Sequence, residues 1–286
     1  MTSVLDRARD FLLRNGRLLE RRLFEHHFEG ASAEPVVRAL VAYQGRDGGF
    51  GSALEPDKRD PASQPVDVQV AFEILDAVDA FDPLIAGRAC DWLAGVATAD
   101  GGVPFALPSV NGAPHAVWWA VEGAQPPADI NPTAAIVGLL RKHGIDHPWI
   151  ARGEAFCWSV IDGSQTEKFH DLAPMICFLE HTPDRPRAEA ALAKLAAGIP
   201  GLVELDVDAA GYVKKPLDWA PSPASFCHRL FSPEVLGRHL AALEARQAQD
   251  GGWPISWETV GPGPQLEYRG VMTVAALRTL QAYGAL

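Results

Sequence analysis

Leu40-Val41-Ala42-Tyr43-Gln44-Gly45-Arg46-Asp47-Gly48-Gly49-Phe50 is one copy of a motif that this chain repeats. A second copy runs from Leu243 through Gln247 and Asp250-Gly251-Gly252 to Trp253. The leucine, glutamine, aspartate, glycines and aromatic residue have the same spacing in both copies. Self-similarity at fixed spacing is the sequence signature of a repeat architecture. We therefore expect the chain to be built from copies of one structural unit.

Weaker copies extend the repeat. Leu93, Ala97 and Asp100-Gly101-Gly102-Val103 keep the spacing, whereas the stretch from Leu202 to Tyr212 keeps only the leucine, the last glycine and the aromatic residue. The stretch 161–163 is a further candidate. The motif aspartates are separated by 100 − 47 = 53 and 250 − 100 = 150 positions, which is three units of about 50. The sequence therefore predicts five or six helix pairs.

Each clear turn lies between two helical patterns. Apolar residues recur at spacings of three and four over 36–43 and 236–244 before the turns, and over 66–80, 132–143 and 270–283 after them. Asn131-Pro132 and Ser232-Pro233 are candidate helix starts, each with an N-cap residue before proline. Paired glycines permit a sharp reversal, while the motif glutamines and aspartates suit bridging and capping of the turn. We interpret the motif as scaffold.

The bulk composition limits the function. Of the 286 residues, 48% are hydrophobic and 21% charged, which predicts one folded domain over 1–286, with an amphipathic helix over 1–30 packing on it. The net charge of -11 disfavours binding to nucleic acid and to anionic membranes. No apolar run reaches the roughly 18 to 20 residues that a membrane-spanning helix needs, so we expect a cytoplasmic protein. The four cysteines form no C-x-x-C pair, and we expect reduced thiols, no metal and no cofactor.

Gln44 to Phe50 and Gln247 to Trp253 resemble the QW repeats of squalene cyclases and the related repeats of protein prenyltransferases. The resemblance implies an all-α fold, an α/α toroid in which an inner ring of helices lines an apolar cavity. It also implies a terpenoid-cyclase or prenyltransferase-like activity on a largely apolar, isoprenoid substrate, in a short bacterial branch with a single toroid. The D-x-D-D acid motif of the cyclases is absent, because Asp206-Val207-Asp208-Ala209 lacks the last aspartate. The zinc-binding motif of the prenyltransferases is not recognisable either.

Three carboxylates are the candidate catalytic groups. Glu55 and Asp57 lie in the acidic, proline-rich loop 52–65, and two neighbouring carboxylates can raise one pKa to give a general acid. Asp67 occupies the position of Thr133 and Thr273 in the helices that follow the other turns. The structural alternatives are a solvated loop for the first two acids and helix capping for Asp67.

Aromatic residues near the turns are the candidate substrate-binding groups. We expect Trp119 and Trp257 to line the site, with further contributions from Trp118, His115, Tyr268 and Arg269. Core packing of the tryptophans and a surface ion pair for Arg269 are the alternatives. DGGW-type turns are also similar to those of some polysaccharide lyases and glycosidases. A carbohydrate-active toroid and a non-catalytic binding module therefore remain open beside the enzyme with an apolar substrate.

Overall fold

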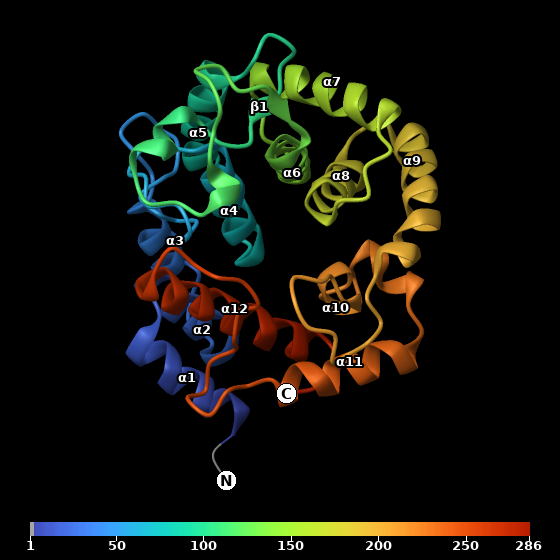
Figure 1. The fold of residues 1–286 in the computed structure, drawn as a ribbon. Coiled ribbons are helices and arrows are strands. Elements are labelled where there is room, and N and C mark those ends of the chain that lie inside the picture. The colour runs from blue at the N-terminus through green and yellow to red at the C-terminus, as the bar shows by residue number, and fades with distance from the viewer. Residues whose placement is uncertain (1–2) are drawn as a thin grey trace. The chain divides into compact units, whose positions relative to one another are not determined.

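The computed structural model describes residues 3–286 and contains twelve α-helices, six consecutive pairs in chain order (Figure 1). They are α1 (Val4–Asn15), α2 (Leu18–Glu29), α3 (Glu34–Val41), α4 (Pro65–Ala77), α5 (Pro83–Val96), α6 (Ile130–Lys142), α7 (Pro148–Gly163), α8 (Phe169–His181), α9 (Arg185–Gly198), α10 (Pro216–Trp219), α11 (Pro233–Ala245) and α12 (Pro262–Ala282). Short 3-10 turns are η1 (Pro108–Gly112), η2 (Val117–Trp119), η3 (Ile199–Leu202) and η4 (Phe226–Leu230). Two-residue strands β1 (Val103–Pro104) and β2 (Ala128–Asp129) pair antiparallel. The predicted all-α class is confirmed.

The chain divides into two compact units. The middle unit comprises residues 33–195, and the terminal unit comprises residues 1–32 together with 196–286. The predicted toroid and the predicted single domain over 1–286 concern both units together, and they stay predictions.

In the middle unit, α4, α6 and α8 pack side by side, and α5 and α7 lie on one side of them (Figure 1). The core between these helices contains Phe72, Leu75, Ile136, Leu140 and Phe178, all buried. The second helix of each pair therefore contributes most of the apolar packing, and the first turn of α4 contacts the loop that carries the candidate acids.

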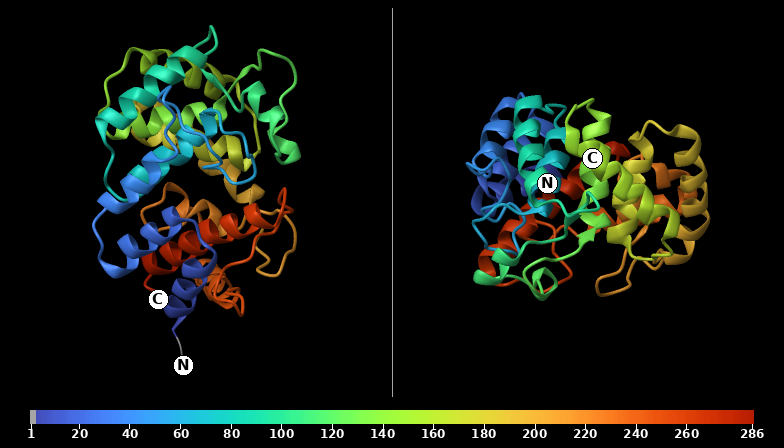
Figure 2. Two further views of the ribbon diagram at one scale, coloured as in Figure 1. Left: turned by 90° about the vertical axis from the view of Figure 1, so that its left-hand side faces the viewer. Right: turned by 90° about the horizontal axis from the view of Figure 1, so that it is seen from above.

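In the terminal unit, both ends of the chain pack together. The blue helices α1 and α2 lie beside the red α12 (Figure 2, left panel). The predicted single helix over 1–30 is two helices, because the backbone is extended at Gly16 and Arg17. Ser3 and Asp6 form a capping box that starts α1, and residues 1 and 2 lie outside the described part of the chain.

Two of the predicted helix starts have different outcomes. Ser232 caps α11 as predicted, accepting a hydrogen bond from Val235 N–H at 3.3 Å. The predicted cap at Asn131 is wrong, since the Asp129 side chain accepts from Asn131 N–H at 3.1 Å and Asn131 itself has non-helical angles. Helix α12 begins at Pro262, two turns before the apolar pattern over 270–283 starts, so the polar beginning of this helix was missed.

The motif glutamines bridge each turn to a second helix. Gln44 Nε2 donates to Gly48 O at 2.9 Å and to Ile85 O of α5 at 3.1 Å. Gln247 Nε2 donates to Gly251 O and to Val4 O of α1, both at 2.9 Å. The predicted bridging role of the motif glutamines is thereby confirmed.

A different residue replaces the glutamine in the third copy. Ala97 stands at the glutamine position, and Trp149 Nε1 of α7 donates to Gly101 O at 3.0 Å instead. The turn carbonyl is therefore satisfied in every clear copy, as a buried backbone group requires.

Each glycine pair packs on an arginine and an aromatic residue four positions later in another helix. The first glycine has φ +96° in all three copies, and a Cβ there would lie 2.1–2.6 Å from an arginine carbonyl oxygen. The second glycine lies against the aromatic ring. The pairs are Arg88 and Trp92 in α5, Arg152 and Phe156 in α7, and Arg7 and Phe11 in α1. We call this contact, with the bridging side chain, the glycine latch.

A half-buried histidine makes the terminal unit sensitive to acid. Burial, and then the charges of Arg278 and His26, lower the pKa of His27 from about 6.5 to about 4. The unfolded chain therefore binds more protons between these values, and stability is lost as the pH falls from about 6.5 to about 4. We expect His27→Leu to flatten the dependence of the free energy of unfolding on pH in this window, measured by urea denaturation. Equal slopes in the two proteins would contradict this assignment.

Candidate functional site

The position occupied by Asp67, Thr133 and Thr273 joins each turn to the helix that follows it. Thr133 Oγ1 accepts from Val103 N–H at 3.0 Å, and Thr273 Oγ1 accepts from Trp253 N–H at 3.0 Å. Both hydroxyls donate to the carbonyl four residues earlier. The three positions are therefore structurally related, although Thr273 lies well inside α12 instead of in its first turn.

Asp67 departs from the hydroxyl pattern by forming a buried ion pair. Its carboxylate accepts from Glu55 N–H at 2.8 Å and pairs with the ammonium group of Lys58. Both charged side chains are 0% exposed. Lys58 was missed in the sequence, where the only signal was a pair of basic residues, Lys58 and Arg59, within an acidic loop. In this arrangement Asp67 fixes the loop and is shielded from solvent.

Two loops pair over the start of α4 and bring most of the predicted residues of the middle unit together. Arg59 N–H donates to Pro114 O and Ala116 N–H donates to Asp57 O, both at 2.8 Å, and Lys58 and His115 form the bridge between these bonds. Residues 57–59 therefore run antiparallel to 114–116, and η2 follows immediately.

The two loop acids differ in exposure. Asp57 is buried, and its backbone N–H donates to Glu55 Oε1 at 3.3 Å. Glu55 is half-buried. Of the three predicted catalytic acids, Glu55 is therefore the most accessible, and a catalytic role for each of them stays a prediction.

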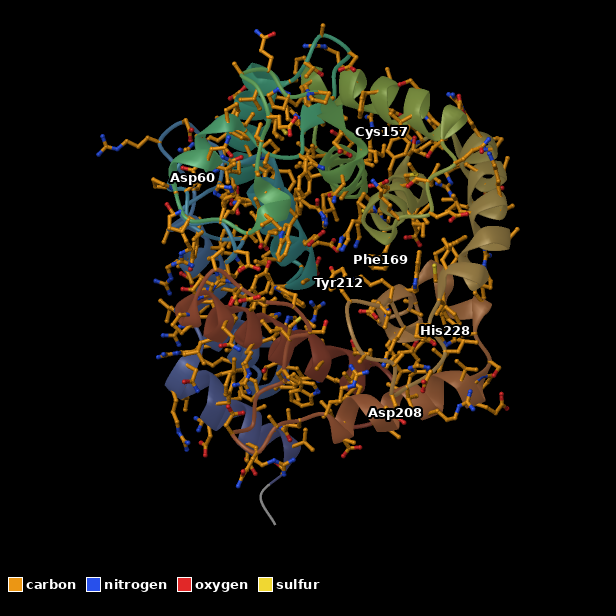
Figure 3. The ribbon with its side chains drawn as sticks, in the orientation of Figure 1. Asp60, Cys157, Phe169, Asp208, Tyr212 and His228 are labelled. Atoms are coloured by element: carbon orange, nitrogen blue, oxygen red, sulfur yellow. The ribbon has the colours of Figure 1, made fainter. Side chains whose placement is uncertain are left out.

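A second buried network ties the same loops to α4. Asp60 Oδ2 accepts from Gln64 Nε2 at 2.8 Å and from Ser109 Oγ at 2.6 Å, and Gln64 Oε1 accepts from Leu107 N–H at 2.7 Å (Figure 3). The Asp60 and Gln64 side chains are buried, and these bonds pair their polar groups. The loop pair is consequently a rigid, well-connected structure, as a preorganised site requires.

The two adjacent tryptophans are placed differently. Trp119 is 5% exposed, stacks on Phe105 with 4.6 Å between ring centroids, and lies 5.9 Å from Lys58 Nζ. Its indole N–H has no acceptor among residues 3–286. Trp118 is 45% exposed. Trp119 thus packs beneath the loops, whereas Trp118 offers an accessible ring.

An exposed carboxyl group at the start of α6 was missed in the sequence. The protein around Asp129 raises the pKa of its carboxyl, mainly by desolvation, and the negative charge of Asp171 adds to the rise. The hydrogen bond from Asn131 N–H and the charge of Lys168 oppose it. Thr166 Oγ1 donates to Asp171 Oδ2 at 2.7 Å and holds that second carboxylate in place.

Asp129 is also where the repeats differ from one another. Ser63, Asp129 and Arg269 each lie four residues before one of the related residues Asp67, Thr133 and Thr273, respectively. Ser63 donates to the motif Asp47 at 2.8 Å, and Arg269 pairs with the motif Asp250 at 2.6 and 2.7 Å. An ionised aspartate in the third copy cannot donate such a bond to the motif Asp100, and Asp129 instead accepts from Asn131 N–H at the start of α6. Aligning the repeats over this position is the signal that would have found it.

Arg269 makes structural contacts with other side chains of the terminal unit. Besides pairing with Asp250, its guanidinium lies 4.6 Å from the ring centroid of Phe11. Arg269 and Asp250 border an open pocket of about 580 Å³, whose other lining residues are Ala248, Gln249, Pro254, Ile255 and Gln265. The predicted substrate-binding role of Arg269 stays a prediction, and the structure adds a role in holding the last turn.

Trp257 and Tyr268 lie together with Tyr212, which was not predicted to bind substrate. The ring centroids of Trp257 and Tyr268 are 4.9 Å apart, and those of Tyr212 and Trp257 are 5.9 Å apart, both edge to face. Tyr212 is 55% exposed (Figure 3). Leu205 and Val213 of the same loop are exposed as well. We call Tyr212, Trp257 and Tyr268 the aromatic cluster.

The metal-binding side chains are dispersed. Within residues 3–286, no group of three or more His, Cys, Asp or Glu side chains is arranged to hold a metal ion. None of the four cysteines forms a disulfide, and burial raises the pKa of the Cys90 and Cys177 thiols to about 12, which keeps them protonated. Among the same residues, no helix combines the length and apolar character needed to span a membrane.

Comparisons with known proteins address the fold. No protein-family model and no curated protein sequence matches the chain. The chain is similar to the crystal structure of a protein from Actinoplanes, with 16% sequence identity and a TM-score of 0.59, over 98% of both chains. At this level of identity the likeness extends to the fold alone.

Proposed function

We propose that this protein is an enzyme that binds a largely apolar, isoprenoid-like substrate and protonates it with a carboxyl group. The observation that carries the proposal is the placement of Asp129 at the start of α6, where desolvation and the neighbouring charge of Asp171 raise the pKa of its carboxyl. A general acid works best when its pKa lies near the working pH, and a neighbouring like charge is one way to raise it.

The residues around Asp129 suit a proton donor. Desolvation, and then the negative charge of Asp171, which Thr166 fixes, disfavour the charged form of Asp129 and raise the pKa of its carboxyl. After transfer, the N–H of Asn131 and the charge of Lys168 favour the carboxylate. The backbone N–H of Ile130 also favours the ionised form, so Asp129 has one charged neighbour that opposes its ionisation and three groups that stabilise it.

Glu55 is the second candidate donor. Its backbone is held by the buried Lys58–Asp67 pair, and its side chain accepts from Asp57 N–H. We assign Lys58 and Asp67 a positioning role for this loop. The two candidate donors lie in loops that precede neighbouring helices, α4 and α6, which pack against each other.

The terminal unit carries an exposed apolar patch of its own. Tyr212 of the aromatic cluster belongs to the same loop as the exposed Leu205 and Val213. Its ring contacts Trp257, which in turn contacts Tyr268. Exposed apolar patches of this kind mark ligand or partner sites. Lys215 Nζ holds the loop by donating to Val207 O at 2.6 Å and to Ala209 O at 3.0 Å, so the patch is presented on a fixed backbone.

Asp129→Asn is expected to lower turnover by about 100-fold or more, the usual contribution of general acid catalysis. Asparagine remains a good N-cap, so folding should be unaffected. The matched control is Asp82→Asn, because Asp82 caps α5 through bonds of 2.7 and 3.2 Å to two N–H groups. Turnover is measured by mass spectrometry of products from prenyl diphosphates, polyenes and oligosaccharides. Full turnover in Asp129→Asn would refute the proton-donor role.

A second measurement needs no substrate. Asp171→Asn removes the like charge, and we therefore expect it to lower the pKa of Asp129 in a carbon-13 NMR titration. Asp82→Asn is expected to leave that pKa unchanged. An unaltered Asp129 titration in Asp171→Asn would show that the two carboxylates are not coupled.

A further inference from the structure

We propose that α1 is an exchangeable helix. The last turn, residues 247–253, binds α1 of its own chain in this structure and can bind α1 of a second copy of the chain. The inference is independent of the proposed function, since it concerns the latch in the terminal unit and not the acids of the middle unit.

The contact between α1 and the last turn is short and self-contained. Gln247 donates to Val4 O at 2.9 Å and accepts from the guanidinium of Arg7. Gly251 lies against the Arg7 carbonyl, and Gly252 lies against the ring of Phe11, which is fully buried. All of these partners fall within the first three turns of α1, so one short helix carries this whole contact, while Arg269 and Thr273 of α12 hold the turn from within the unit.

The same chemistry is used by helices with different chain connections. The first turn binds Arg88 and Trp92 of α5 through the corresponding glycines, and Arg88 Nη2 donates to Gly45 O at 3.0 Å. Recognition therefore depends on an arginine followed four residues later by an aromatic residue on a helix. It does not depend on how that helix is linked to the turn.

In the sequence, α1 is unusually far from the turn that it binds. Gln44 and its carbonyl partner in α5 are 41 residues apart, whereas Gln247 and Val4 are 243 residues apart. The probability of closing a flexible loop falls as the 3/2 power of its length, so α1 reaches its turn roughly 14-fold less readily in the unfolded chain. A second copy competes better for a contact of this kind, and exchange of an identical element is a low-cost route to a dimer.

Complementation between two full-length variants tests the exchange. Phe11→Ala has a defective helix and an intact turn, and Gly251→Ala has an intact helix and a defective turn. After the two are mixed, unfolded in urea and refolded together, we expect a heterodimer of twice 30.8 kDa by native mass spectrometry. Each variant refolded alone is expected to remain a monomer.

A milder pair guards against failure of either variant to fold. Arg7→Ala and Gln247→Ala each remove one side chain from the latch and leave the glycines and Phe11 in place. A heterodimer in either mixture, absent from the variants alone, supports the exchange. If both mixtures contain only monomers at concentrations up to about 1 mM, the proposal is overturned.

Discussion

Replacing Gly251 by alanine is expected to lower the free energy of unfolding by about 2–6 kcal/mol, the sum of about 1–3 for a strained backbone and about 1–3 for overpacking. The residue has φ +96°, which side chains with a Cβ rarely adopt, and its new Cβ would lie 2.1 Å from Arg7 O. The neighbour is a helix backbone, which cannot yield without moving α1. Urea denaturation followed by circular dichroism measures the effect.

The control for this prediction is Gly237→Ala. Gly237 lies on an exposed face of α11 in the same unit, with no atom within 4 Å of the added Cβ. Alanine is favoured over glycine inside a helix by roughly 0.5–1 kcal/mol, so this variant should gain stability. If the two substitutions have similar effects, the latch is not under the steric constraint described above.

Lys58→Met is expected to destabilise the protein by about 3–5 kcal/mol, the usual effect of removing one partner from a buried ion pair. The carboxylate of Asp67 would remain buried without its counter-charge, which desolvation makes costly. Methionine keeps most of the lysine side-chain volume, so the change in packing is small. The midpoint and slope of urea unfolding, compared with the unmodified chain, give the free-energy change.

The repeats provide a matched rescue of that variant. Threonine occupies the position of Asp67 in the two copies where it accepts a turn N–H. The double variant Lys58→Met, Asp67→Thr removes both charges, and we expect it to regain most of the lost stability, since replacing a whole buried pair is often neutral. If Asp67 and Lys58 position Glu55, this stable double variant should still lose substrate turnover. A double variant as unstable as Lys58→Met would contradict the charge argument.

Much of the local structure follows from the sequence. The spacing from Leu40 to Phe50 predicts a helix, a Gly-Gly turn and a bridging glutamine, and all three are present. These features depend on backbone angles and on hydrogen bonds between residues close in the chain. The missed beginning of α12 has the same explanation in reverse, because residues 262–269 are largely polar and carry no apolar period.

Only part of the candidate site could be predicted from the sequence. Selecting Asp57, His115, Trp118 and Trp119 from the sequence identified two loops that the structure pairs through residues 57–59 and 114–116. The partner of Asp67 was missed, because ion pairing of Lys58 depends on the fold of the loop and not on its composition. Tyr212 was noted only as a remnant of the repeat, and its contact with Trp257 comes from a distant segment.

By itself, the sequence determined the all-α class and the repeated turn, since a glycine pair and an apolar period act over a few residues. Only the tertiary structure decided that the last turn binds Arg7 and Phe11 of the first helix, with Arg7 240 residues from Gln247 in the chain. It also decided that Asp129 lies beside Asp171 and has a raised pKa. A pKa depends on the charges and the water that surround a group in space, and residues far apart in the chain set both.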